Sequence, residues 1–93
     1  MGNSGYRAQV CHRHHMSVDP YSDVPLYEQA AAILRKRIKS GEWERLELLP
    51  SETQLAQELG VARDTIRSAL ALLRDEGLVF TIKARGTYVG PRP

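Results

Sequence analysis

Arginine and hydroxyl side chains in the second half of the chain have the types and spacing that suit contact with nucleic acid. Arg63 and Arg67 are four residues apart, so on a helix they lie on neighbouring turns of one surface. A guanidinium can donate two hydrogen bonds to the O6 and N7 atoms of guanine, which is worth about 1–3 kcal/mol of discrimination. Hydroxyl groups at Thr53 and Thr65 can bind phosphate oxygens. The candidate DNA-binding residues are Ser51, Glu52, Thr53, Arg63, Asp64, Thr65, Arg67, Ser68, Lys83, Arg85 and Gly86.

Two short helices joined by a tight turn are predicted to position most of these side chains. The Ser51 hydroxyl can accept a hydrogen bond from the amide of Gln54, whose side chain can reach back to form a capping box. Gly60 ends this helix, and the next helix is expected over residues 63–76. The residues spaced to face the interior are Leu55, Ala56, Leu59, Ile66, Ala69, Leu70 and Leu73. This is a helix-turn-helix, whose second helix presents its first residues to the major groove.

Elements on either side of these helices complete the expected fold. Pro25 suits a first helical turn and Gly41 suits a helix end, so a first helix is expected over residues 26–40. A short extended stretch is expected over residues 47–49, and a hairpin, or wing, over residues 78–89. The inward face of the first helix is expected to hold Leu26, Tyr27, Ala30, Ala31, Leu34 and Ile38. The order helix, helix, helix, hairpin predicts an α+β winged helix-turn-helix.

The turn of the wing carries a second basic group. Its strands are expected over residues 78–82 and 87–89, which leaves Lys83, Arg85 and Gly86 at the tip. From there the wing can reach the minor groove, where a narrow, A/T-rich stretch attracts arginine. The third helix is therefore expected to read the major groove and the wing the minor groove.

Two features of the first half leave alternatives open. Trp43 is either a core residue beneath the first helix or a platform on which a base stacks. The basic run "RKRIK", residues 35–39, either contacts phosphate or lies solvated on the outer face of the first helix.

The chain is expected to contain one small domain and a tail. Residues 1–23 mix Gly, Asn, Ser, His and Asp with isolated apolar residues, which predicts a flexible tail. The winged helix-turn-helix is expected over residues 24–90, with a short C-terminal tail over residues 91–93. Met16 is a second candidate for the start of translation.

Composition and motifs argue against several classes of protein. The net charge is +2, the single cysteine permits no internal disulfide, and neither a long apolar run nor a signal-peptide pattern occurs. This pattern is typical of the cytoplasm and indicates no membrane partner. Ser51 and Thr65 lack a paired base, so no enzyme is expected. The possible metal ligands are Cys11, His12, His14 and His15. Because no second cluster fixes their geometry, we expect an adventitious tract, with no metal or cofactor.

Three segments resemble the DNA-binding domain of the GntR family of bacterial transcription regulators: "PLYEQAAAILRKRIKSG", "LPSETQLAQELGVARDTIRSALALLRDEGLV" and "ARGTYV". The resemblance covers residues 24–89. It implies a winged helix that binds a pseudo-palindromic operator as a dimer and normally represses transcription until a C-terminal effector domain releases it. The DNA contacts that the resemblance implies fall on residues 51–53 and on Arg63, Thr65, Arg67, Arg85 and Gly86.

The chain departs from the family pattern in three turns and in length. Ala62 stands where the family has Ser or Thr, which costs about 1 kcal/mol if a helix cap is lost. Arg45 and Leu46 replace a Pro-Gly turn, and Ala84 replaces a glycine of the wing, so the shapes of both turns stay open. Only "GPRP" follows Val89, so we expect no effector site within this chain, which is either a stand-alone regulator or an excised domain.

The expected function is sequence-specific binding of double-stranded DNA by a repressor in the cytoplasm, at the nucleoid. The alternative from another class is a winged helix that serves as a protein-interaction module. Such a module is expected to show an apolar or acidic face on its third helix. Arg63, Arg67 and Arg85 favour DNA.

Overall fold

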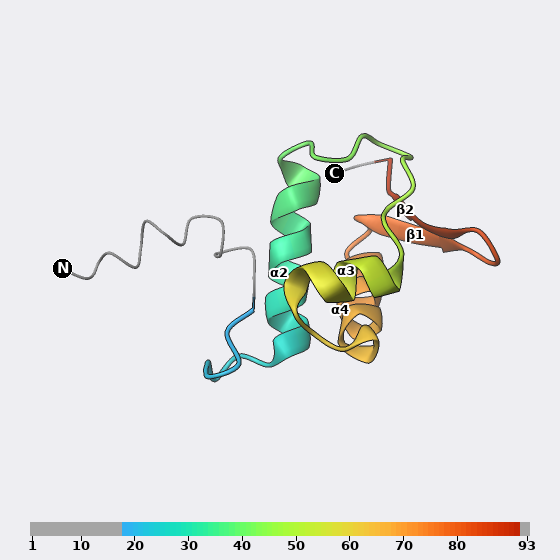
Figure 1. The fold of residues 1–93 in the computed structure, drawn as a ribbon. Coiled ribbons are helices and arrows are strands. Elements are labelled where there is room, and N and C mark those ends of the chain that lie inside the picture. The colour runs from blue at the N-terminus through green and yellow to red at the C-terminus, as the bar shows by residue number, and fades with distance from the viewer. Residues whose placement is uncertain (1–17, 92–93) are drawn as a thin grey trace.

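The predicted order of helices and strands is present in the computed structural model, which describes residues 18–91. In chain order the elements of this range are α2 (Leu26–Lys39), α3 (Glu52–Leu59), α4 (Arg63–Asp75), β1 (Val79–Ile82) and β2 (Gly86–Val89) (Figure 1). Their bounds lie within one residue of those expected for the first and third helices and for both strands. The α+β winged helix-turn-helix is confirmed.

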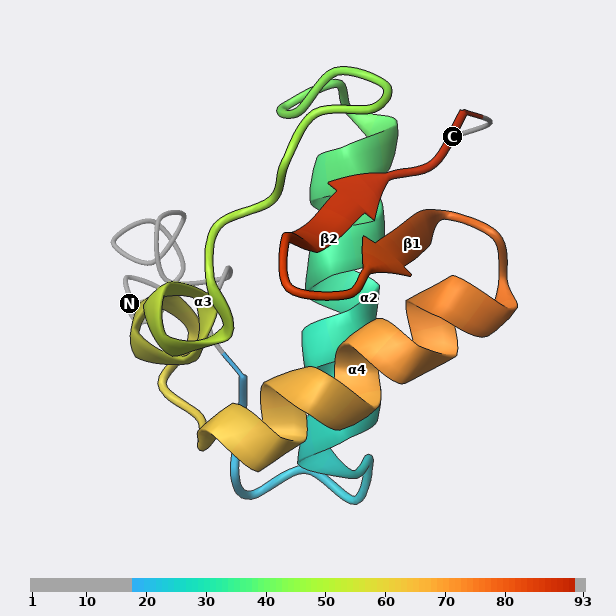
Figure 2. The same cartoon turned by 90° about the vertical axis from the view of Figure 1, so that its right-hand side faces the viewer.

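The core forms where α4 lies across α2 and packs against α3 and β1 (Figure 2). Its largest fully buried side chains are Leu34, Leu55, Leu59, Ile66, Leu73 and Val89. The prediction that Leu26 and Tyr27 share the buried face of α2 is wrong. They are 36% and 38% exposed, because the buried part of α2 begins at Ala30 and the first helical turn extends past it.

Trp43 belongs to the core, as one of its two interpretations predicted. Its side chain is 8% exposed, and the guanidinium carbon of Arg37 lies 4.6 Å from the ring centroid. This geometry is a cation–π contact that fixes the loop after α2 against the helix. A tryptophan buried in this way has no face free for a nucleic-acid base.

Caps and a left-handed glycine set the geometry of the helix-turn-helix. The Gln54 amide donates to the Ser51 hydroxyl at 3.1 Å, which confirms that half of the capping box. Within the described range the side chain of Gln54 makes no return bond to Ser51, so the second half of the box is wrong. Gly60 ends α3 at φ +74°, and Val61 packs partly buried against the core. The two helices therefore meet at a short, fixed turn.

The extended stretch before α3 pairs with the hairpin. Leu48 forms a bridge with Tyr88, and the Leu49 amide donates to the Thr87 carbonyl at 2.8 Å. The prediction of a short extended segment over residues 47–49 is confirmed. Because this segment lies beside β2, it ties the wing to the beginning of α3.

Both turns that lack the glycine of the family pattern keep a left-handed backbone. Leu46 has φ +66° and Ala84 has φ +67°. Residues with a Cβ atom rarely adopt this region, because Cβ approaches the following carbonyl oxygen. The substitutions therefore leave the shape of both turns glycine-like and add local strain.

The segment before α2 is hydrogen-bonded to that helix. The Asp19 amide donates to Gln29 Oε1 at 2.6 Å, and Gln29 Nε2 donates to the carbonyls of Asp19 and Val24. Residues 18–23, which the sequence analysis assigned to the tail, thus contact α2. The remainder of that tail, with Met16 and the tract from Cys11 to His15, lies outside the described residues. No helix within residues 18–91 is long and apolar enough to cross a membrane.

Candidate nucleic-acid interface

One face of the molecule brings together the beginning of α3, helix α4 and the wing, which consists of β1, β2 and the turn between them. This face is turned toward the viewer in Figure 2. An open hollow of about 450 Å³ lies among these elements. Its lining includes Ser51, Glu52, Thr53, Arg63, Leu70, Ala84, Arg85 and Gly86. Candidate residues from three separate segments therefore surround one hollow.

The two arginines in the first two turns of α4 are exposed and held by carboxylates. The Arg63 and Arg67 side chains are 56% and 54% exposed. Arg67 Nε donates to Glu52 Oε1 at 3.0 Å, and Arg67 Nη1 donates to Asp64 Oδ1 at 3.2 Å. Arg63 Nη2 lies 3.6 Å from the same Glu52 oxygen. These four predicted site residues form one ion-pair group, the Glu52 cluster, to which both α3 and α4 contribute.

The hydroxyl-bearing candidates differ in how freely they can meet a ligand. Thr53 and Ser68 are exposed, whereas Thr65 is half-buried in the first turn of α4. The Ser51 side chain is exposed, although its oxygen already accepts the Gln54 amide. The backbone amides at the beginning of α3 add donors of the kind that suit a phosphate group.

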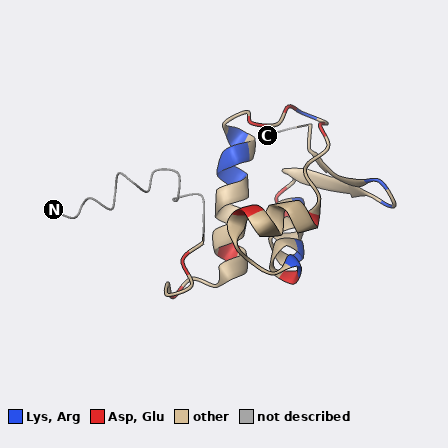
Figure 3. Ribbon diagram, viewed as in Figure 1, with Lys and Arg blue, Asp and Glu red and all other residues tan. Residues whose placement is uncertain are grey.

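The wing tip presents basic side chains to solvent. Lys83 and Arg85 are exposed in a turn that is closed by a 2.9 Å bond from the Arg85 amide to the Ile82 carbonyl. Figure 3 shows basic residues at this tip and residues of both charges at the beginning of α4. Gly86 has φ +130°, and a Cβ there would lie 2.9 Å from Leu48 Cδ1. Close packing against Leu48 therefore accounts for the glycine at this position, independently of any contact with DNA.

Two large, exposed apolar side chains of the hollow were not identified as site residues from the sequence. Leu48 is 49% exposed and Ile82 is 42% exposed, and both line the hollow between the wing and α3. Alternation along a strand assigns side chains to opposite faces of the strand. It does not predict which of these faces stays exposed once the wing has packed against the rest of the domain.

The two arginines of the basic run of α2 are engaged in ion pairs. Arg35 donates to both carboxylate oxygens of Glu76 at 2.8 and 2.7 Å. Arg37, whose side chain is 12% exposed, pairs with Glu42 and Glu58. Hydrogen bonds from these arginines hold the pKa of Glu42 and that of Glu76 below their ordinary value of 4.5. The structure therefore gives Arg35 and Arg37 an internal role and offers no support for phosphate contact by them.

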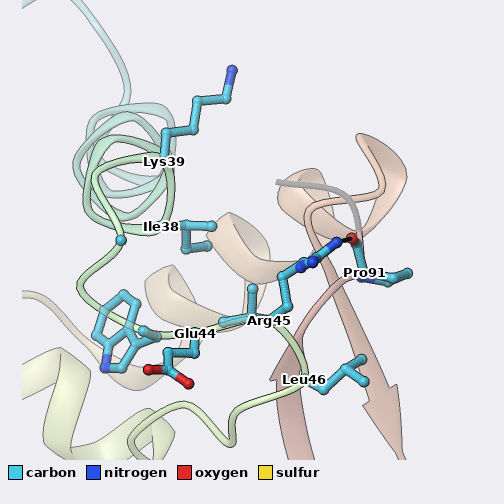
Figure 4. A pocket seen from close by; sticks show the side chains of 9 residues that line it. Ile38, Lys39, Glu44, Arg45, Leu46 and Pro91 are labelled. Carbon is cyan, nitrogen blue, oxygen red and sulfur yellow. Dashed lines mark hydrogen bonds between the residues drawn. The ribbon is translucent and has the colours of Figure 1, made fainter.

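A second open hollow of about 650 Å³ lies at the end of α2, at the opposite end of the molecule from the beginning of α4 (Figure 1, Figure 4). Arg45 crosses it and donates to the Pro91 carbonyl at 3.2 Å. The lining residues are Ile38, Lys39, Gly41, Trp43, Glu44, Arg45, Leu46, Val89 and Pro91. Of the candidate DNA-binding residues, none lines this hollow.

Comparisons with known proteins identify the family. Residues 26–89 match the pattern of the bacterial regulatory proteins of the gntR family. The chain is 40% identical over 74 residues to the HTH-type transcriptional repressor NagR of Bacillus subtilis, which covers 80% of this chain and 30% of NagR. The chain belongs to the GntR family.

Solved structures of similar proteins agree with this family assignment. The structure of AraR(DBD) in complex with operator ORX1 is 32% identical with a TM-score of 0.71, covering 78% of this chain and 90% of that one. YtrA from Sulfolobus acidocaldarius, a GntR-family transcription factor, is 32% identical with a TM-score of 0.73, covering 85% and 83%. The resemblance and the class of function, a DNA-binding transcription regulator of the GntR family, are confirmed. The chain spans under a third of the length of curated relatives such as NagR.

Proposed function

We propose that the chain binds a specific double-stranded operator and represses transcription, with α4 in the major groove and the wing in the minor groove. The observation that carries this proposal is the common face on which the exposed Arg63 and Arg67 of α4 lie with the exposed Lys83 and Arg85 of the wing. Support comes from AraR(DBD), a domain with the same fold whose structure was solved on an operator.

The first two turns of α4 supply the base contacts. Arg63 and Arg67 can donate bidentately to guanine, and each such contact is worth about 1–3 kcal/mol of discrimination. The exposed Ser68 is small, so the helix can approach the floor of the groove. Asp64, beside Arg67, can accept a hydrogen bond from cytosine.

The beginning of α3 and the wing contact the backbone and the second groove. Thr53, Thr65 and the amides after Ser51 bind phosphate oxygens, which set the register of the protein on DNA without reading sequence. Lys83 and Arg85 enter the neighbouring minor groove, and Gly86 lets the wing pack closely beside the 47–49 segment. The narrow groove of an A/T-rich flank attracts the Arg85 guanidinium.

The partner is a pseudo-palindromic operator that binds two chains. A single winged helix offers few contacts, and dimers of helix-turn-helix proteins place two recognition helices about 34 Å apart. The function is binding rather than catalysis, and it is exerted in the cytoplasm, where the bacterial nucleoid lies. The relatives are about three times as long as the matched region, so any effector site belongs to a part of such a protein outside the winged helix.

A winged-helix protein-interaction module is the competing function. It would need an apolar or acidic face on α4, whereas Arg63 and Arg67 occupy that face. A gel shift separates the two functions, with promoter fragments from the gene's own genomic neighbourhood and a scrambled duplex of equal composition as the control. Preferential, salt-sensitive binding to one promoter fragment is expected. Equal affinity for all duplexes, or no binding at low salt, would rule out the operator-binding proposal.

A further inference from the structure

Glu52 places a negative charge within the face that is proposed to meet DNA. Its carboxylate oxygen Oε1 contacts Arg67 Nε at 3.0 Å and Arg63 Nη2 at 3.6 Å. Asp64 also pairs with Arg67, at 3.2 Å. Two guanidinium groups and two carboxylates thus form a group with no net formal charge, although the arginines are the residues expected to read bases.

We propose that Glu52 is a specificity-determining residue, which holds Arg63 and Arg67 so that they bind base edges and contribute little to binding of arbitrary DNA. This inference rests on the proposed function and deepens it. Non-specific affinity comes almost entirely from cations that neutralise phosphates and release counterions. A carboxylate between the two arginines removes part of that attraction on every duplex, whatever its sequence.

The hydrogen bonds within the cluster leave the base-reading edge of Arg67 available. Contact with Glu52 uses the Nε–H group, and contact with Asp64 uses one N–H group of Nη1. No other residue of the described range 18–91 accepts from the second N–H group of Nη1 or from Nη2, and these groups can donate to guanine O6 and N7. On the correct base pair, Arg67 can therefore bind without leaving Glu52. The same edge could donate to a phosphate, but the neighbouring carboxylates of Glu52 and Asp64 repel an anionic phosphate more than a neutral base edge.

Restriction of the two side chains strengthens this preference. An arginine loses considerable rotamer freedom when it binds, and an arginine that is already held in position loses less. The benefit appears only where the held geometry matches the DNA. The electrostatic cost, in contrast, falls equally on operator and non-operator sequences, so the ratio of the two affinities rises.

The test compares Glu52→Gln with Glu58→Gln. Both substitutions remove one negative charge from α3 and keep the size of the side chain. Glu58 pairs with Arg37, away from the proposed interface, and Arg37 retains its contacts with Glu42. The probes are a duplex that the wild-type chain enriches from a randomised library and a scrambled duplex of the same composition. Thermal unfolding of each variant monitors any effect of the substitutions on α3.

For Glu52→Gln we expect affinity for the scrambled duplex to rise about three- to tenfold, as one charge removed near phosphates predicts. Affinity for the enriched duplex should rise less, so discrimination falls by about threefold or more. The dependence of log K on log salt on the scrambled duplex should steepen by up to about one unit, because an arginine becomes free for phosphate. Glu58→Gln should leave all three quantities unchanged.

Two results would overturn the inference while leaving the proposed function intact. One is an equal change of affinity on both duplexes, which would make Glu52 a general electrostatic or structural residue. The other is a salt dependence and discrimination identical to wild type. Failure of the wild-type chain to enrich any duplex would instead refute the proposed function, and the inference with it.

Discussion

At the scale of single residues, Ala84 holds the wing turn in a conformation that glycine adopts more easily. Its φ of +67° brings Cβ close to the following carbonyl oxygen. Ala84→Gly removes this strain but increases the entropy of the unfolded chain, so we expect the free energy of unfolding to rise by about 0.5 kcal/mol. Urea denaturation measures it. Ala32→Gly, at an exposed position of α2, is the control and should lower the free energy of unfolding by about 1 kcal/mol.

Arg67 and Arg85 are expected to contribute to DNA binding in different ways. Arg67→Ala should reduce the difference in binding free energy between the operator and the scrambled duplex by about 1–3 kcal/mol, because a base-edge contact is lost. This difference is more informative than the affinity for either duplex alone, because the substitution leaves the Glu52 and Asp64 carboxylates without Arg67 on any duplex. Arg85→Ala should lower affinity on most sequences and make the salt slope shallower by about one unit.

A salt titration of both variants on both duplexes measures these effects. Lys36→Ala, which removes an exposed positive charge from α2, controls for net charge. It should change neither the ratio of operator to scrambled affinity nor the salt dependence of binding. If Arg85→Ala leaves the salt slope untouched, the wing does not contact phosphate or the minor groove as proposed. An equal loss on both duplexes for Arg67→Ala would mean that α4 reads no base through this residue.

At the scale of elements, α4 begins without a side-chain cap. Ala62 has the extended backbone of a capping residue, with φ −74° and ψ 156°, yet it has no oxygen to accept an amide of the first turn. We expect Ala62→Ser to raise the free energy of unfolding by about 1 kcal/mol. Ser51→Ala, which removes the cap of α3, should lower it by a similar amount. Denaturation curves for both variants measure these changes. If Ala62→Ser does not raise the free energy of unfolding, the amides of the first turn of α4 already have other hydrogen-bond partners.

The contact between the loop after α2 and the helix is expected to respond to acid. Arg37 lowers the pKa of Glu42 in the folded chain, chiefly by hydrogen bonding. A lowered pKa gives stability that is complete above the ordinary value of 4.5 and is lost as pH falls through the folded pKa. Since Glu42 is 43% exposed, the contribution is at most about 1 kcal/mol.

The free energy of unfolding, measured by denaturation from about pH 6 to about pH 3, tests this dependence. Glu42→Gln should lower stability at the upper end and lose less stability than wild type on acidification. Glu76→Gln is the parallel case, because Arg35 lowers the pKa of Glu76 in the same way. Identical pH profiles for wild type and both variants would contradict the assigned role of these ion pairs.

Local signals were sufficient to predict the elements, whereas contacts between elements were not predictable. Apolar spacing with Pro25, Ser51 and Gly60 located helix boundaries, because caps and periodicity are properties of neighbouring residues. The exposure of Leu26 and the left-handed backbone of Leu46 depend on what packs around them. The α4 face carrying the arginines followed from the helical repeat, but their pairing with a carboxylate of another helix did not.

At the scale of the whole molecule, the proposed interface is small for a tight and specific complex. Helix α4 has 13 residues, so it is about 20 Å long, and only its first turns and the wing tip present the basic side chains that are proposed to contact DNA. A single module of this kind buries about 600–1,000 Å² on DNA. Two chains on adjacent half-sites double the contacts, which is the physical reason to expect a pseudo-palindromic operator.

We therefore predict that the chain binds a two-half-site duplex as a two-to-one complex and a single half-site weakly. The half-sites should lie about one helical turn apart, or a multiple of it, because both α4 helices must enter the major groove from the same side of the duplex. Inserting about five base pairs between them rotates one half-site to the opposite side and should reduce affinity toward that of a single half-site, whereas inserting about ten should restore part of it. Sedimentation velocity gives the stoichiometry, and a titration across the spacing series gives the affinity. A one-to-one complex with full affinity, independent of spacing, would show instead that one winged helix is the complete reading unit and that the two-chain arrangement is wrong.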